Sequence, residues 1–195
     1  MPITAQQVKE LRETTGAAMM ACKKALVEAD GDMEKARTLL REKGLAKAQS
    51  KAARETAEGV VMPYVHGNGR IGVLVLLACE TDFVARSPEF QELARELAMQ
   101  VAAMSPTVVR PEDLSESVLQ AERDIYRQQC ADKPAKIQDR IIEGKMATFF
   151  AETCLLKQPY IRDDTRTVEA LITEKIAKLG ENIEVKKIVR LEVGT

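Results

Sequence analysis

The spacing of apolar residues changes from helical to strand-like near residue 57, and this change requires a fold that contains both kinds of element. Before that point, apolar side chains recur every three to four residues, as in amphipathic helices. After it, two runs alternate with a period near two, as in strands. Later stretches return to helical spacing, and the final run alternates again. The pattern predicts an α+β fold in which an antiparallel sheet of about three strands is packed by helices.

Three short helices are predicted at the N-terminus. The first begins at a capping box formed by Thr4 and Gln7, and the third ends before Gly44. Residues 45–56 are rich in Ala, Lys and Arg and carry almost no apolar stripe, which favours a solvated connecting helix. We therefore expect three parts: a three-helix N-terminal domain over 1–44, a linker helix over 45–56 and an α+β core over 57–195.

A β-hairpin is predicted at the start of the core. The pair Asn68-Gly69, a strong hairpin signal, lies between two β-rich runs, and the second run, residues 70–79, is apolar on both faces. Such a run is typical of a central strand. Residues 67–72 also match the pattern G-x-G-x-x-G, but a dinucleotide-binding loop leads into a helix, whereas this one joins two strands. We interpret the glycines as turn residues and predict no nucleotide site.

The remaining elements follow from helix-start signals and from one more alternating run. Helices are predicted after Ser87, Pro111 and Lys133, and the last two of these could form an antiparallel hairpin. A further helix ends at Gly180. The final run is predicted to return to the sheet as a strand, with five apolar side chains on one face: Ile183, Val185, Val189, Leu191 and Val193.

Composition excludes several classes of function. The formal net charge is -1, so no global field attracts phosphate backbones, and we expect no direct contact with nucleic acid. No apolar run approaches the roughly 18 residues of a membrane span, and the N-terminus lacks the pattern of a signal peptide, so we expect a cytoplasmic protein without membrane contact. The 4 cysteines are widely separated and only 1 histidine is present, which favours reduced, buried thiols and no metal or cofactor site.

One short link combines an aromatic side chain with a carboxylate. Thr81, Asp82, Phe83 and Val84 lie between the apolar run 70–79 and the helix that Ser87 begins. Rigid flanks would make this link an effective wedge against another molecule. The alternative, which the pattern alone favours, is that Phe83 packs into the core while Asp82 only stabilises the turn.

Two segments resemble the signatures of the elongation factor Ts family. Residues 11–26 read LRETTGAAMMACKKAL, and residues 81–84 read TDFV. Residues 30–32, 39–44, 144–146 and 155–160 also fit the family in order, so the resemblance covers nearly the whole chain. It implies a protein that is not an enzyme: a guanine nucleotide exchange factor whose partner is the GTPase elongation factor Tu. It also implies a ubiquitin-associated-like fold for the three N-terminal helices.

The resemblance assigns roles to two groups of residues. The first group would grip the GTPase domain of elongation factor Tu: Arg12, Met19, Met20 and Lys23. The second group would form the loop that dislodges the magnesium ion of that partner: Thr81, Asp82, Phe83 and Val84. By pattern alone, the first four would be interpreted as packing or ordinary surface residues.

Length separates this chain from the larger family members, which carry a core of two related subdomains and additional helical parts. We therefore expect a homodimer in which two cores join. Two alternatives stay open. The chain could be a small RNA or ribosome accessory factor, against which the near-zero net charge argues. It could also be an enzyme that uses Glu80 or Asp82 as an acid or base, although no second catalytic group is apparent in the sequence.

Overall fold

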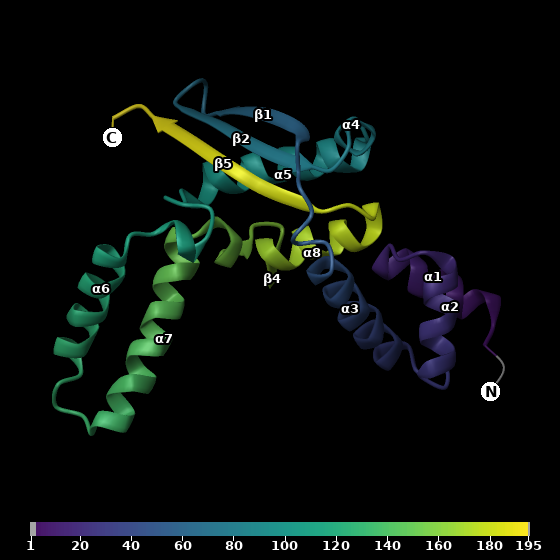
Figure 1. Cartoon of the computed structure of the whole chain (residues 1–195), viewed down its shortest axis with the longest axis horizontal. Helices are drawn as coiled ribbons and strands as arrows, with labels where there is room; N and C mark the ends of the chain where they lie inside the picture. The colour runs from purple at the N-terminus through teal and green to yellow at the C-terminus, as the bar shows by residue number, and fades with distance from the viewer. Residues whose placement is uncertain (1–2, 195) are drawn as a thin grey trace. The chain divides into compact units, whose positions relative to one another are not determined.

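The computed structural model describes residues 3–194, and the chain divides into two compact units (Figure 1). The first unit runs through Gly59 and adds the segments Ala78–Phe90 and Ala170–Glu184. The second unit holds Val60–Leu77, Gln91–Glu169 and the chain from Val185 onward. Within residues 3–194, no helix has both the length and the apolar character needed to cross a membrane. Helices and an antiparallel sheet are both present, which confirms the predicted α+β class.

The three N-terminal helices form as predicted, and they are α1 (Ala5–Thr15), α2 (Met19–Glu28) and α3 (Met33–Gln49). The capping box begins α1, because the Gln7 amide donates to the Thr4 hydroxyl at 3.2 Å and the Thr4 amide donates to the Gln7 side chain at 2.9 Å. Gly16 ends α1 with φ at 65°, a left-handed conformation that glycine adopts without strain.

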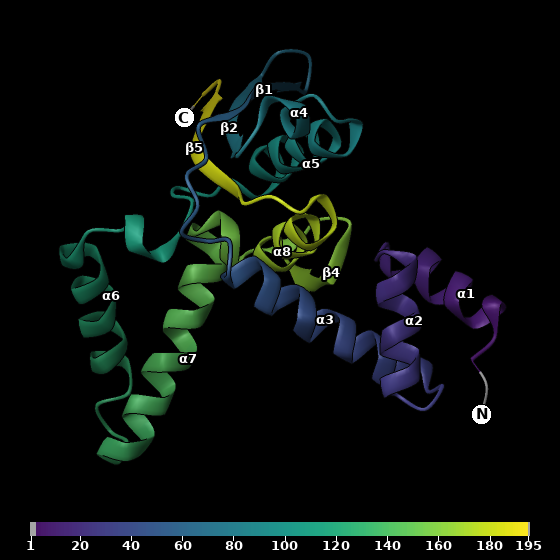
Figure 2. The same ribbon diagram turned by 45° about the vertical axis from the view of Figure 1, so that its right-hand side comes forward.

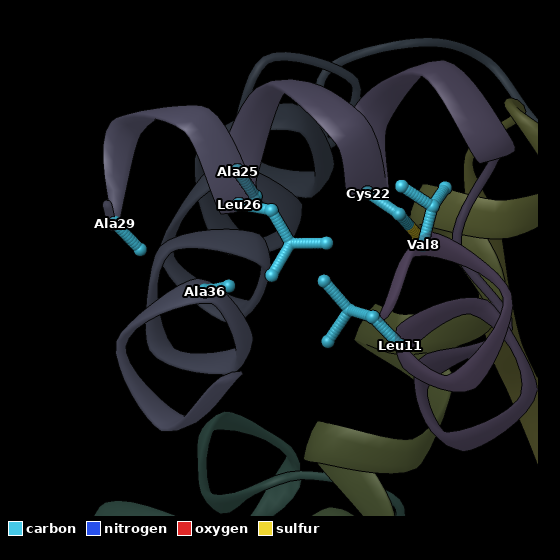
Figure 3. Packing of buried hydrophobic residues seen from close by; sticks show 7 residues of the cluster. All are labelled: Val8, Leu11, Cys22, Ala25, Leu26, Ala29 and Ala36. Carbon is cyan, nitrogen blue, oxygen red and sulfur yellow. The ribbon is translucent and has the colours of Figure 1, made fainter. Parts of the chain in front are cut away.

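A small apolar core holds these helices together (Figure 3). The side chains of Leu11 and Leu26 point toward each other between the helices, and neither is accessible to solvent. Much of the rest of this core is alanine, which lets the helix backbones approach closely. The buried cluster comprises Val8, Leu11, Cys22, Ala25, Leu26, Ala29 and Ala36.

The third helix is longer than predicted. It continues through Gly44 to Gln49, and turns follow it, so the structure has one helix where two were predicted and none over 50–56. Ala, Lys and Gln after Gly44 are strong helix formers and outweigh the cost of one interior glycine. Gly44 also lies close to α8, since a Cβ added there would be 3.5 Å from the Cβ of Ala177. The proposed domain boundaries remain a prediction.

The main sheet has three strands in the order β1-β2-β5, and these are Glu58–His66, Ile71–Cys79 and Ile183–Glu192. The central place of β2 is confirmed. Gly67, Asn68 and Gly69 turn the β1–β2 hairpin with φ values of 61°, 55° and 88°. The G-x-G-x-x-G match is therefore a strand-to-strand turn, as predicted.

Among residues 3–194, side chains cover one face of this sheet and leave the other face open. In β2, Val73, Val75 and Leu77 are buried, whereas Leu74 and Leu76 on the opposite face are exposed. Helix α5 (Pro88–Met104) packs against the sheet (Figure 1). The helix predicted after Ser87 is confirmed, and the apolar side chains along one side of it are inaccessible to solvent: Phe90, Leu93, Ala94, Leu97 and Val101.

The prediction that one face of the last strand carries all five apolar residues is wrong. Val185 is buried, but Val189 and Leu191 are exposed. The alternation changes phase between them, and the guanidinium of Arg190 takes the covered side, where it donates to the Ala102 carbonyl oxygen at 3.3 Å. A partly buried hydrogen bond from arginine therefore replaces the apolar contact that simple alternation predicts.

The other elements complete the two units. Helices α6 and α7 lie side by side in both views and form the predicted hairpin (Figure 2). A two-stranded antiparallel ribbon of β3 and β4 was not predicted. The remaining bounds are α4 Asp82–Ala85, η1 Pro111–Asp113, α6 Glu116–Gln129, α7 Ala135–Thr153, η2 Leu155–Lys157, β3 Pro159–Tyr160, β4 Asp163–Thr167 and α8 Val168–Leu179.

Candidate functional site

The predicted link 81–84 forms a one-turn helix, α4, that presents an aromatic side chain to solvent. Phe83 is 87% exposed, whereas Ala85 on the same turn is buried. Two residues advance an α-helix by about 200°, so Ala85 and Phe83 point in nearly opposite directions. The alternative that Phe83 packs into the core is therefore wrong.

An exposed aromatic side chain such as Phe83 can still gain free energy by becoming buried against a partner. Burying a Phe side chain is worth about 1.5–3 kcal/mol relative to leaving it in water. Phe83 gains almost none of this in the free chain, since it is among the most exposed large apolar residues described. A partner with an apolar crevice would recover it on binding.

The neighbouring carboxylate carries only a weak ion pair. Asp82 accepts from Arg86 at 3.1 Å, and both side chains are largely exposed. Pairs of this kind contribute about 0.2–1 kcal/mol, because water screens both charges. The Asp82 carboxylate can therefore exchange this contact for another at little cost.

Thr81, which precedes both residues, is held by hydrogen bonds on all its polar atoms. Its backbone amide donates to Glu181 Oε2 at 3.0 Å, and its hydroxyl donates to Glu181 Oε1 at 2.6 Å. The same hydroxyl caps α4 by accepting from the Val84 amide at 3.4 Å. Its carbonyl oxygen accepts from the Ala85 amide at 3.1 Å and from the Cys79 thiol at 3.2 Å.

Glu80, the residue before Thr81, is also held by contacts with distant residues. The Asn182 amide donates to Glu80 Oε1 at 2.6 Å, and Arg54 lies 3.3 Å from Glu80 Oε2. The hydrogen bond from the Asn182 amide, assisted by Arg54, lowers the pKa of Glu80 below its ordinary value. A lowered pKa keeps this carboxylate ionised at neutral pH, so Glu80 is poorly suited to the role of a general acid.

Sequence reasoning missed Arg54, Glu181 and Asn182. Glu181 lies 100 residues beyond Thr81, and none of the three belongs to a motif that would link it to the 81–84 segment. The one available signal was the glycine at 180, which predicted a helix end and therefore a turn, but not what that turn contacts.

The N-terminal candidates form a second exposed group. Arg12 lies on α1, and Met19, Met20 and Lys23 lie on α2, all with exposed side chains. Met19 is 56% and Met20 is 62% exposed, so neither packs into the three-helix core. Flexible, unpacked methionines between basic side chains are typical of protein-binding surfaces.

The cysteines behave as predicted, because all 4 are buried and free. Burial raises the pKa of Cys79 to about 11, which keeps its thiol protonated at neutral pH. Among residues 3–194, no three His, Cys, Asp or Glu side chains cluster in a way that would hold a metal ion.

Comparisons with known proteins agree on one family. A family model described as Elongation factor TS matches residues 4–195. A Carboxydothermus hydrogenoformans protein named Elongation factor Ts is 56% identical over 194 residues, which are 98% of this chain and 89% of the relative. The Thermotoga maritima protein of the same name is 56% identical over 194 residues, covering 100% of this chain and 98% of the relative. That of Fervidobacterium nodosum is 54% identical over 196 residues, covering 100% of both.

Proposed function

Because the chain belongs to the elongation factor Ts family, we propose that it is the guanine nucleotide exchange factor for elongation factor Tu in translation elongation. It binds the GDP-bound GTPase, dislodges the magnesium ion and promotes release of GDP, so that GTP can bind. This is a binding reaction without a covalent step, and it needs no catalytic group or cofactor from this chain. Its place of action is the cytoplasm, where translation occurs.

The observation that carries the proposal is the exposed Phe83 on a short, pinned helix. Phe83 enters an apolar crevice of the partner and displaces a segment beside its phosphate site. Asp82 approaches the ordered polar shell of the magnesium ion and perturbs it. Loss of the ion leaves the charge of the diphosphate poorly compensated, and GDP dissociates.

The N-terminal group supplies binding that does not depend on this insertion. Met19 and Met20 offer apolar contact area, and Arg12 and Lys23 offer charge. Linkage is reciprocal, so a factor that weakens nucleotide binding must itself bind more weakly when nucleotide is present. The ternary complex is therefore transient, and either ligand can expel the other.

The test is release of a fluorescent GDP analogue from elongation factor Tu, with wild-type protein and with Phe83→Ala. The variant forfeits up to about 1.5–3 kcal/mol of burial, and each 1.36 kcal/mol is tenfold, so we expect the maximal release rate to fall about tenfold to a hundredfold. Binding should persist through the N-terminal group. Val118→Ala removes an exposed apolar side chain from α6 and serves as the matched control.

Two outcomes would contradict the proposal at different levels. If Phe83→Ala releases GDP as fast as wild type, Phe83 has no part in the mechanism. If the wild-type protein does not accelerate release from a cognate partner, the exchange function itself is wrong. Nucleic acid that co-purifies with the protein, visible in the ultraviolet absorbance ratio, would then favour the accessory-factor alternative.

We further propose that the protein forms a homodimer through the open face of the β1-β2-β5 sheet. An exposed apolar face of this kind is uncommon on monomers and is stabilised by a second copy. The residues that support this are Val61, Val65, Leu74, Leu76, Val189 and Leu191, all of which are exposed. Sedimentation at micromolar concentration should give a dimer for wild type and a monomer for Leu74→Glu. A monomeric wild type would refute the pairing.

A further inference from the structure

The turn between α8 and β5 contacts the segment 80–84, called here the exchange loop, through two hydrogen-bonded pairs of residues. Glu80 accepts from the Asn182 amide at 2.6 Å, and Thr81 donates its amide to Glu181 at 3.0 Å. Two adjacent loop residues thus pair with two adjacent turn residues, and each segment supplies one carboxylate. Paired contacts of this kind fix orientation as well as distance.

The turn is itself anchored, so it can serve as a fixed support. Gly180 reverses the chain after α8 with φ at 82°. Its carbonyl oxygen accepts from the ammonium group of Lys51, which is buried. The Asn182 side chain donates to the carbonyl oxygens of Ala52 and Arg54 at 3.4 and 2.9 Å. All of these residues belong to the first compact unit.

Glu181 also determines how Thr81 caps α4. A hydroxyl has one proton to donate and two lone pairs that accept. The Thr81 proton goes to Glu181 Oε1 at 2.6 Å, which leaves the lone pairs for the Val84 amide. Without Glu181 the hydroxyl could rotate and donate to water, and the cap would lose its preferred geometry.

Helix α4 depends on such end contacts for its position. It has 4 residues, and an isolated helix of that length does not hold together in water. Its outward side chain, Phe83, is 87% exposed and gains little orientation from packing. The direction of Phe83 is therefore set by what holds the ends of the turn, and small errors in such positioning have large effects on function.

We infer that Glu181 is a positioning residue for nucleotide exchange: through its carboxylate it holds Thr81 and thereby sets the direction in which α4 presents Asp82 and Phe83 to the partner. This inference rests on the exchange function proposed above. In this inference Glu181 acts through its two hydrogen bonds to Thr81 and has no direct role at the nucleotide or the magnesium ion.

The experiment compares Glu181→Ala with wild type in steady-state GDP release over a range of partner concentrations. We expect the maximal rate to fall about tenfold while the KM for the GDP-bound partner changes less than about twofold, since the N-terminal group is untouched. Glu181→Gln keeps one acceptor oxygen, so its maximal rate should lie between those of wild type and Glu181→Ala. Glu28→Ala, which removes a surface ion pair with Lys43 in the same unit, is the matched control and should match wild type.

A double-mutant cycle separates positioning from a general loss of stability. Thr81→Val removes the hydroxyl group that donates a hydrogen bond to the Glu181 carboxylate. Thr81→Val leaves the bond from the Thr81 backbone amide to Glu181 in place, so the cycle isolates the hydroxyl bond. If Glu181 acts through this hydroxyl, adding Glu181→Ala to Thr81→Val should reduce the maximal rate less than adding it to wild type does. Full additivity of the two effects together with unchanged exchange of the Thr81 amide, or equal changes in KM and maximal rate, would overturn the inference.

A readout that needs no partner keeps this test independent of the exchange function. Amide hydrogen exchange of the free protein should be about tenfold faster at Thr81 and Val84 in Glu181→Ala, and unchanged in Glu28→Ala. Unchanged exchange at both amides would overturn the inference whatever the release assay gives. Faster exchange in a protein whose wild type does not release GDP would support the positioning of α4 and refute the proposed function alone.

Discussion

Truncating Leu26 tests whether the three N-terminal helices are held by one close-packed core. The side chain of Leu26 is inaccessible to solvent and faces Leu11. A buried Leu→Ala substitution costs about 2.7–5.0 kcal/mol, with the larger values at sites that cannot collapse into the cavity. Several neighbours here are alanines on helices that are already close, so little material can move inward. We expect Leu26→Ala to cost about 3–5 kcal/mol.

The assay is amide hydrogen exchange across α1, α2 and α3, with urea unfolding as a second measurement. Protection of these helices should fall by the expected free energy. The matched control is Val27→Ala, because Val27 is the next residue on α2 and is 57% exposed. Surface substitutions of this kind usually stay within about 0.5 kcal/mol. In the release assay, Leu26→Ala should raise KM more than it lowers the maximal rate, because Met19 and Met20 lie on the destabilised helix.

A loss below about 1 kcal/mol in Leu26→Ala would refute this reasoning, because it would mean that the core fills the space of a missing side chain. An equal loss of free energy in Val27→Ala would refute the reasoning on another ground. The effect would then come from the helix itself and not from the contact between Leu26 and Leu11.

Three further predictions concern the surroundings of the exchange loop. Burial raises the pKa of Cys79 to about 11, so iodoacetamide should modify this thiol only after the protein unfolds. Peptide mass spectrometry measures the modification, and rapid modification of the native protein would contradict the burial of Cys79. The pKa of Glu80 lies below its ordinary value of 4.5, mainly because the Asn182 amide donates to it, so its contribution to stability is present above that pH and is lost as the pH falls through the lowered value. In urea unfolding, the destabilisation by Glu80→Gln should therefore shrink in acid, and a difference that is constant with pH would refute this. Gly180→Ala places a methyl group on a residue with φ of 82° in otherwise open space, so backbone strain alone should lower the free energy of unfolding by about 1–2 kcal/mol. An unchanged free energy in urea unfolding would contradict this prediction.

Features set by neighbouring residues could be predicted from the sequence. The capping box of Thr4 and Gln7 and the Asn68-Gly69 turn both depend on contacts within a few residues. The central place of β2 followed from its composition, because a strand with neighbours on both sides tolerates apolar residues on both faces.

Features that depend on distant segments could not be predicted. Phe83 and Ala85 are both apolar, and local pattern does not decide which of them faces inward, because α4 is held at Thr81 by Glu181, a residue 100 positions away. In β5, simple alternation failed where Arg190 took the covered side to reach a carbonyl of α5. The roles of Thr81 to Val84 and of the N-terminal group came from family resemblance and not from pattern, which favoured an inward Phe83.

The hydrogen bonds between Thr81 and Glu181 can form only late in the synthesis of the chain. The two residues are 100 apart in sequence, so the exchange loop leaves the ribosome long before the turn that holds it. The small core around Leu26 lies entirely within residues 8–36, and contacts of such short sequence separation form early. We therefore expect a nascent chain to acquire its N-terminal helices first and a correctly oriented Phe83 last. Under the roles proposed above, a chain interrupted before residue 181 would keep the N-terminal binding group but lack the contacts that hold Thr81.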